Sequence, residues 1–348
     1  MLLQNAQDFP LWANILIFGI AAVIVWFTGT RLTRDVDGIA EQTGMGQAFV
    51  GMLLLGSITS LPEIANCITS AVIGAPALAV NNLLGSASIN LLLLAGVDAF
   101  VGRKAATAMV AQPSTLMMAA LCMLVLAAVA LAIVVGDALI FGIGIAAALI
   151  CALSVGAFWI VSGYEARTAW ALKPQQKTKQ KRANGEADAQ QQSLRFLILR
   201  TVLAGALIFA AGYSLAQTGD AIATQTGIGA GMIGFVLIGT ATSLPELSTI
   251  TAAFRIRRYE MAFGQVLGTN FVNLALIVLI DAFFAGGPVI NELGRFEIVS
   301  ALLGVFLIGI LLVGLLEHRD PKIMRMGYDS LAVVLVFAGG VLLLYMIR

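Results

Sequence analysis

The stretch TSLPE occurs twice in this chain, at Thr59–Glu63 and again at Thr242–Glu246. Each copy places a carboxylate inside a long run that is otherwise free of charge. Each also contains a proline, which removes a backbone donor and clashes with the preceding turn, so the helices are expected to kink or break there. The two copies lie 183 positions apart (246 − 63), and this spacing decides the fold.

The duplication extends well beyond five residues. Residues 37–100 align with residues 220–283 at the same offset without a gap, and 25 of the 64 aligned pairs are identical. Asp, Gln, Thr, Pro, Glu and Asn are among these identities, so a shared apolar composition does not explain the match. We therefore expect two structural repeats, one in each half of the chain.

The composition is that of a membrane protein. The chain is 59% hydrophobic and 11% charged, whereas a soluble domain carries roughly 25% charged residues. Because about 20 apolar residues span a bilayer core, the pattern predicts ten spans, two of them interrupted at TSLPE. Their predicted limits are 10–30, 37–73, 77–101, 105–134, 137–163, 195–217, 221–254, 260–285, 293–316 and 328–347.

A long polar stretch follows the fifth predicted span. Residues 165–194 are rich in Lys, Gln and small polar residues, so we expect a flexible cytoplasmic linker between a first membrane half at 1–164 and a second at 195–348. In this ten-span topology 18 of the 20 Lys and Arg residues lie on the same side as the linker. The positive-inside rule therefore places both termini outside.

Five spans precede the second half, an odd number, so the two repeats enter the membrane in opposite directions. Inverted repeats are typical of secondary transporters, which bind their substrates near the bilayer midplane on interrupted helices. The pseudo-two-fold axis brings Glu63 and Glu246 toward each other. No Lys or Arg lies within a predicted span of either repeat, so two facing glutamates would repel unless they hold protons or a cation.

The side chains near both carboxylates are oxygen donors. A Thr and a Ser precede each glutamate, and one span later a Ser or Thr and an Asn share a helical face at i and i+4. All-oxygen ligation suits a hard cation, and Ca²⁺ is favoured because it tolerates about six to eight ligands. These donors are Thr59, Ser60, Ser86 and Asn90 in the first repeat and Thr242, Ser243, Thr269 and Asn273 in the second.

These paired motifs resemble the two alpha repeats of the Ca²⁺/cation antiporter superfamily, which has the sodium/calcium exchanger fold. That pattern runs roughly GTSLPE followed by GNxxGSNxxN/D, and both repeats of this chain match it. The resemblance implies an all-α polytopic membrane protein of about ten transmembrane helices in two inverted-topology repeats of five. It implies that Glu63 and Glu246 are the principal cation ligands and that the eight neighbouring donors bind or line the site. Asn273 stands where potassium-dependent relatives tend to carry Asp, which argues against K⁺ co-transport.

We therefore expect a secondary antiporter in a bacterial inner membrane that exports Ca²⁺ in exchange for Na⁺ by alternating access. Exchange of Ca²⁺, or of another divalent cation, for H⁺ is the alternative, and a cation channel is a more remote one because channels usually build acidic rings from oligomer symmetry. No HExxH, GxSxG or P-loop pattern occurs, which argues against an enzyme. The expected partners are inorganic cations and the lipid bilayer, with no resident cofactor and no nucleic acid.

Two further interpretations concern residues outside the ligand sets. Asp37, Asp98, Asp220 and Asp281 recur in both repeats near predicted span ends, where we expect solvated or helix-capping carboxylates. The first and sixth predicted spans carry none of the candidate ligands. They are the candidates for a pair of helices that slides to open each side of the membrane.

Overall fold

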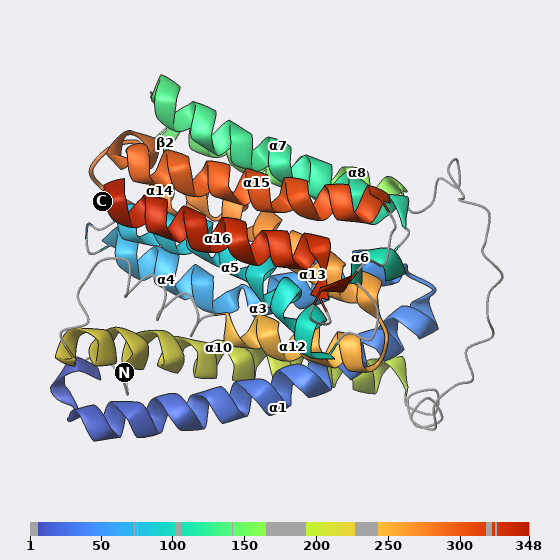
Figure 1. Ribbon diagram of the computed structural model, residues 1–348. Helices are drawn as coiled ribbons and strands as arrows, with labels where there is room; N and C mark the ends of the chain where they lie inside the picture. The colour runs from blue at the N-terminus through green and yellow to red at the C-terminus, as the bar shows by residue number, and fades with distance from the viewer. Residues whose placement is uncertain are drawn as a thin grey trace.

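The structure is a computed structural model that describes residues 6–72, 74, 76–101, 106–110, 112–140, 142–164, 193–226, 243–317, 322–323 and 326–347. These residues are almost entirely helical (Figure 1). Within them, eight helices are long and apolar enough to cross a membrane, and the bent pair Gln47–Thr59 and Leu61–Val72 makes a ninth span. The all-α polytopic fold predicted from the sequence is therefore confirmed.

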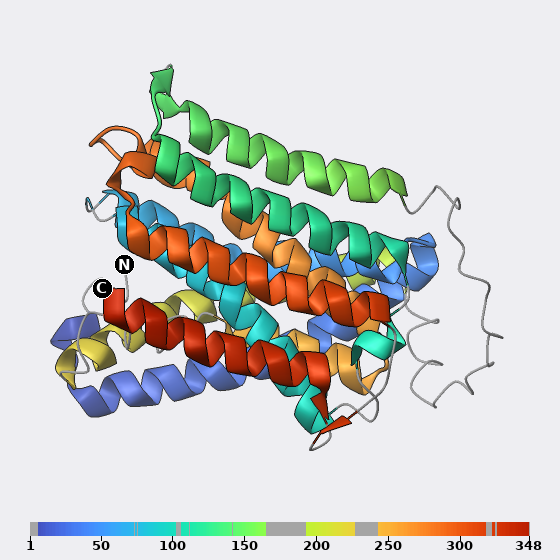
Figure 2. The ribbon, with the colours of Figure 1, turned by 45° about the horizontal axis from the view of Figure 1, so that its top comes forward.

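The helices form three layers (Figures 1 and 2). Two long helices lie along each other in one outer layer, and a group of shorter and broken helices fills the middle. The outer layer on the opposite side consists of four helices that pack against one another and against the middle group. In this order the layers are α1 (Leu11–Thr43) and α10 (Leu194–Gln225), then α4 (Leu61–Val72), α5 (Pro76–Val101), α12 (Leu244–Arg255), α13 (Tyr259–Ala275) and α14 (Ile277–Phe283), and finally α7 (Pro113–Val135), α8 (Ile145–Tyr164), α15 (Arg295–Glu317) and α16 (Tyr328–Ile347).

Short elements connect these helices. Four of them are one or two turns of helix and two are antiparallel hairpins of two-residue strands. In chain order they are η1 (Ala6–Asp8), α2 (Gln47–Val50), η2 (Gly51–Gly56), α3 (Ser57–Thr59), α6 (Ala106–Met109), β1 (Leu139–Ile140), β2 (Ile143–Gly144), η3 (Val289–Glu292), β3 (Lys322–Ile323) and β4 (Met326–Gly327).

The first and sixth spans are longer than the sequence pattern predicts. Helix α1 continues past residue 30 to Thr43 and ends where Gly44 adopts the left-handed conformation (φ 71°), as at many helix C-termini. The charged last turns of α1 are neutralised by other segments, because Arg200 of α10 pairs with Asp35 at 2.9 Å and Arg258 pairs with Asp37 at 2.7 Å. The predicted break after residue 30 is therefore wrong.

The internal repeat extends beyond the aligned 64 residues. Hairpin β1–β2 pairs Leu139 with Gly144, and hairpin β3–β4 pairs Lys322 with Gly327, so the two hairpins are also 183 residues apart (327 − 144). Each leads directly into a 20-residue helix, α8 or α16. The sequence analysis placed residues 137–144 inside a helical span, which is wrong because the chain turns there.

Asp98, near the end of α5, fastens the second hairpin. Its Oδ1 accepts a hydrogen bond from the backbone N–H of Ala106 at 2.8 Å. Its Oδ2 accepts one from the Ser330 hydroxyl at 2.7 Å and one from the Gly327 N–H at 3.5 Å. The carboxylate of the first repeat is thus a hydrogen-bond acceptor for the hairpin of the second half.

Asp281 has the reciprocal role. It accepts a hydrogen bond from the Gly144 N–H of the first hairpin at 2.6 Å and one from the Val289 N–H at 2.7 Å. Asp98 and Asp281 are both buried, so the interpretation of these two as solvated carboxylates is wrong. They bind backbone donors instead, which is closer to the capping interpretation. The side chain of Asp220 lies outside the described part of the chain.

Candidate cation site

The first TSLPE stretch interrupts its helix in two ways. The six residues Gly51–Gly56 form a π-helix, and after the short helix α3 the regular pattern breaks at Ser60 before α4 begins at Leu61. The two helical segments are bent by 43°. Pro62 is the second residue of α4, where its missing N–H removes no helical hydrogen bond. The predicted break is present, whereas the π-helix, a feature often found at functional sites, was not predicted.

The second TSLPE stretch also begins a helix. Helix α12 starts at Leu244 with Pro245 in its first turn and Ser243 as the preceding residue. Glu246 therefore lies in the first turn of α12, as Glu63 lies in the first turn of α4. A helix N-terminus favours a negative charge by its dipole, so both glutamates have the same local stabilisation. Thr242 lies outside the described residues.

Both glutamates are fully buried. Among the described residues, none of their four carboxylate oxygens has a hydrogen-bond partner, and the two charges are close enough to interact with each other. A charged side chain at the bilayer centre costs about 3 kcal/mol on insertion scales. Two such charges facing each other form an arrangement that requires cations or protons.

The middle helices of the two repeats cross at equivalent positions. The Asn270 side chain of α13 donates a hydrogen bond to the Ala87 carbonyl of α5 at 3.5 Å, and residues 87 and 270 correspond in the 183-residue repeat. The pseudo-two-fold axis therefore passes close to this contact. Beside it, the hydroxyl oxygens of Thr59 and Thr269 lie 3.4 Å apart, which brings two predicted donors from opposite repeats together.

The other predicted donors are buried as well. The hydroxyls of Thr59 and Ser60 donate to the carbonyls of Leu55 and Gly56, at 3.0 Å and 2.9 Å, so their oxygens stay available as acceptors. The hydroxyls of two serines and both amide atoms of two asparagines have no partner among the described residues. These are Ser86, Ser243, Asn90 and Asn273. Nine of the ten predicted site residues are thus placed in the interior, and the tenth is Thr242.

Gln265 is a further buried group that was not predicted as part of the site. Its amide nitrogen donates to the Thr249 hydroxyl, which in turn donates to the Glu246 carbonyl at 3.0 Å. Its amide oxygen is buried without a partner in the described part of the chain. The sequence signal was its correspondence to Asn82 in the first repeat, where the family pattern carries Asn.

Both long helices of the outer layer touch the half-helices that carry the glutamates. Ser248 of α12 donates a hydrogen bond to the Trp26 carbonyl of α1 at 3.0 Å, and a Cβ at Gly29 would lie 2.2 Å from the Ser248 hydroxyl oxygen. The equivalent glycine of α10 is Gly212 (29 + 183), where a Cβ would lie 2.4 Å from Pro62. Each long helix therefore packs closely against the glutamate-bearing helix of the opposite repeat.

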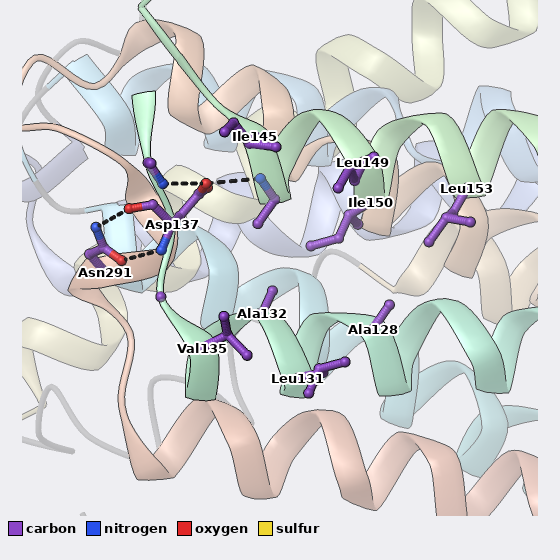
Figure 3. A pocket seen from close by; sticks show the side chains of 13 residues that line it. Ala128, Leu131, Ala132, Val135, Asp137, Ile145, Leu149, Ile150, Leu153 and Asn291 are labelled. Atoms are coloured by element: carbon purple, nitrogen blue, oxygen red, sulfur yellow. Dashed lines mark hydrogen bonds between the residues drawn. The ribbon is translucent and has the colours of Figure 1, made fainter. Parts of the chain in front are cut away.

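The largest groove lies elsewhere. It has a volume of about 630 Å³ between α7 and α8 (Figure 3) and is lined mainly by apolar side chains, several of them exposed on the lipid-facing surface. Its polar end is occupied by internal hydrogen bonds, because Asp137 and Asn291 bind each other at 2.8 and 2.9 Å and the Asp137 carboxylate accepts from the Ala146 N–H at 2.9 Å. None of the ten predicted residues lines it, so the candidate site is the buried cluster.

These features define a class: a polytopic membrane transporter for cations, built from two inverted repeats that carry buried oxygen donors. The profile of the family described as sodium/calcium exchanger protein matches residues 13–162 and 196–346. The chain belongs to the sodium/calcium exchanger family and is a multi-pass cation antiporter.

Named relatives and solved structures agree with this assignment. The chain is 25% identical over 309 residues to the inner membrane protein YrbG of Escherichia coli K12, covering 88% of this chain and 89% of YrbG. It is 24% identical over 283 residues to the putative antiporter CaxA of Alkalimonas amylolytica, covering 80% and 82%. A structure of the sodium-calcium exchanger NCX_Mj soaked with Na⁺ and Sr²⁺ matches its fold with a TM-score of 0.72 at 16% identity, covering 96% of this chain and 99% of the exchanger.

Proposed function

We propose that this protein exports Ca²⁺ in exchange for Na⁺ by alternating access, at a midplane site built around Glu63 and Glu246. The observation that carries this proposal is the pair of fully buried carboxylates whose charges interact and whose oxygens have no partner in the described residues. The surrounding hydroxyl and amide oxygens suit a hard cation, and Ca²⁺ accepts more oxygen ligands than Mg²⁺ does.

The mechanism follows from competition for one site. Ca²⁺ and the driving ion neutralise the same two carboxylates, so they bind alternately. An empty site leaves two buried charges uncompensated, and this disfavours reorientation without cargo. Exchange is thereby favoured over leak. Exchange of Ca²⁺ or another divalent cation for H⁺ is the alternative, because buried carboxylates readily bind protons.

The moving parts in this proposal are α1 and α10. They form a layer of their own (Figure 1) and touch the glutamate-bearing helices through Gly29 and Gly212. The small contact residues let each long helix pass closely over the half-helix beneath it. Sliding this pair relative to the middle layer would open the site to one side of the membrane and then to the other.

The driving ion is identified by Ca²⁺ uptake into proteoliposomes under separately imposed Na⁺ and pH gradients. We expect concentrative uptake when Na⁺ inside exceeds Na⁺ outside, and none with an equal Na⁺ concentration on both sides. Uptake driven only by the pH gradient would replace Na⁺ with H⁺ as the counter-ion. Ca²⁺ flux that simply follows its own gradient, regardless of both counter-ions, would contradict antiport and favour a channel.

We further propose that the protein lies in a bacterial inner membrane with both termini outside and the linker at 165–194 between its two halves. The ion pairs of Arg200 and Arg258 with the last turns of α1 support one basic end of the helix bundle. Basic loops prefer the cytoplasmic side.

This topology predicts the labelling of single introduced cysteines, in a variant whose three native cysteines are replaced. A cysteine at Gly185 should react with an impermeant maleimide only in inverted vesicles, and one added after Arg348 only in intact spheroplasts. Labelling of both positions from the same side would contradict the inverted relation of the two halves. Unlabelled denatured protein serves as the control for total thiol.

A further inference from the structure

The charge of the buried site comes from two side chains alone. Glu63 is the only charged residue in 44–97 and Glu246 the only one in 221–254, and 261–280 contains none. Other buried acids in the described residues have partners of their own. Asp35 pairs with Arg200, while Asp98 and Asp281 accept hydrogen bonds near the ends of their spans. The site therefore holds two negative charges and no fixed positive charge.

Two amides occupy the positions where a third or fourth carboxylate would be possible. Asn90 and Asn273 are equivalent in the repeat, fully buried, and without a hydrogen-bond partner in the described part of the chain. Each lies three residues, about one helical turn, beyond the crossing of Ala87 with Asn270. Their helices α5 and α13 both contact α12, which carries Glu246, and α5 also contacts α4, which carries Glu63. An amide oxygen can bind a cation without adding charge.

A charge of two restricts which loaded states can cross the membrane. A site that is closed off from water on both sides is strongly disfavoured when it carries net charge. One divalent cation neutralises two carboxylates, and so do two monovalent cations. A third monovalent cation would leave a buried positive charge with no further carboxylate to balance it.

From this charge balance we infer that exchange is electroneutral, with two monovalent cations moving against each divalent cation. Asn90 and Asn273 are then specificity-determining residues, because their amides supply ligands while holding the site at two negative charges. This inference rests on the antiport proposed above and adds its charge stoichiometry, whichever monovalent ion drives it.

The test measures the final Ca²⁺ ratio in proteoliposomes of the full-length protein with a fixed gradient of the driving ion. Valinomycin and a tenfold K⁺ gradient set the membrane potential in one arm, and equal K⁺ abolishes it in the other. Each net charge moved per cycle would shift the final Ca²⁺ ratio about tenfold between the arms, since the work on a charge is proportional to the potential. We expect the two arms to agree within about twofold.

Asn273→Asp provides the decisive variant, because a third carboxylate admits a third monovalent cation. Its final Ca²⁺ ratio should shift about tenfold between the arms. Asn90→Asp, the equivalent change in the first repeat, serves if Asn273→Asp does not fold. Asn273→Ala is the matched control: it removes the amide without adding charge, so its flux should fall while remaining insensitive to the potential.

The outcomes separate the two proposals. A tenfold shift in the parent protein would overturn electroneutral exchange while leaving antiport intact. A parent without any counter-ion-dependent flux would overturn antiport, and the inference with it. Folded Asp variants that stay insensitive to the potential would show that neither asparagine sets the charge of the transported site, and would overturn their assignment as specificity-determining residues.

Discussion

Glu63→Gln and Glu246→Gln should each lower the initial rate of Ca²⁺ exchange by at least about 100-fold. Each glutamate is fully buried and without a hydrogen-bond partner in the described residues. Removing one charge leaves a single carboxylate, which cannot offset the dehydration of a divalent cation. A loss of about 3 kcal/mol, the cost of one uncompensated charge in the membrane, corresponds to roughly 100-fold in rate. The measurement is Ca²⁺ uptake per folded molecule in proteoliposomes.

Asp281→Asn is the matched control for this prediction. Asp281 is also a buried acid on a middle-layer helix, but both its oxygens bind backbone N–H groups at 2.6 and 2.7 Å. Its replacement should lower the melting temperature while flux per folded molecule stays within about twofold, because a neutral acceptor weakens charge-assisted hydrogen bonds. Near-normal exchange by a folded Glu63→Gln or Glu246→Gln protein would remove that residue from the ligand set.

Gly264→Ala should destabilise the protein by at least about 2 kcal/mol, in the range of overpacked cores. A Cβ at Gly264 of α13 would lie 2.0 Å from the Ala48 carbonyl oxygen, and a Cβ at Gly51 would lie 2.2 Å from the Met261 carbonyl oxygen. These contacts are between backbones, so no side-chain rotation can relieve them. The helices would have to separate, and the contact between Thr59 and Thr269 depends on their close approach.

The measurement is the melting temperature of the detergent-purified protein, followed by size-exclusion chromatography after heating. Gly96→Ala is the control, because Gly96 also lies within a membrane helix but has nothing within 4 Å of its would-be Cβ. That change should be neutral or slightly stabilising, since Ala favours helix over Gly. Equal melting temperatures for the two variants would mean that α13 and the first interrupted helix are farther apart than the structure places them.

Much of the architecture follows from the sequence because its determinants are periodic or repeated. The apolar runs predict membrane helices by length alone, and the constant offset of 183 residues predicts two related halves. Proline within TSLPE predicts the interruption before α4, because the missing donor and the ring clash act on the local backbone. The set of oxygen donors could likewise be named before their positions were known, although their role as ligands stays a prediction.

Span limits could not be predicted as well. Asp35 and Asp37 read as the polar end of a span, yet α1 continues through them because Arg200 and Arg258, far away in the sequence, neutralise their charge. Likewise, residues 137–144 are apolar enough to read as helix. Only the contact of Gly144 with Asp281 of the other half explains why a hairpin is stable there.

The sequence by itself thus determined the membrane class, the duplication and the residues that recur in both copies, because each depends on composition, length or a fixed spacing along one chain. The tertiary structure alone decided which of those recurring acids have partners. Asp98 and Asp281 repeat as faithfully as Glu63 and Glu246, but backbone donors of the opposite half satisfy the aspartates, whereas the described residues leave the glutamates facing each other unpaired. Partnership depends on which segments meet across the pseudo-two-fold axis, and distances between remote segments are set by packing.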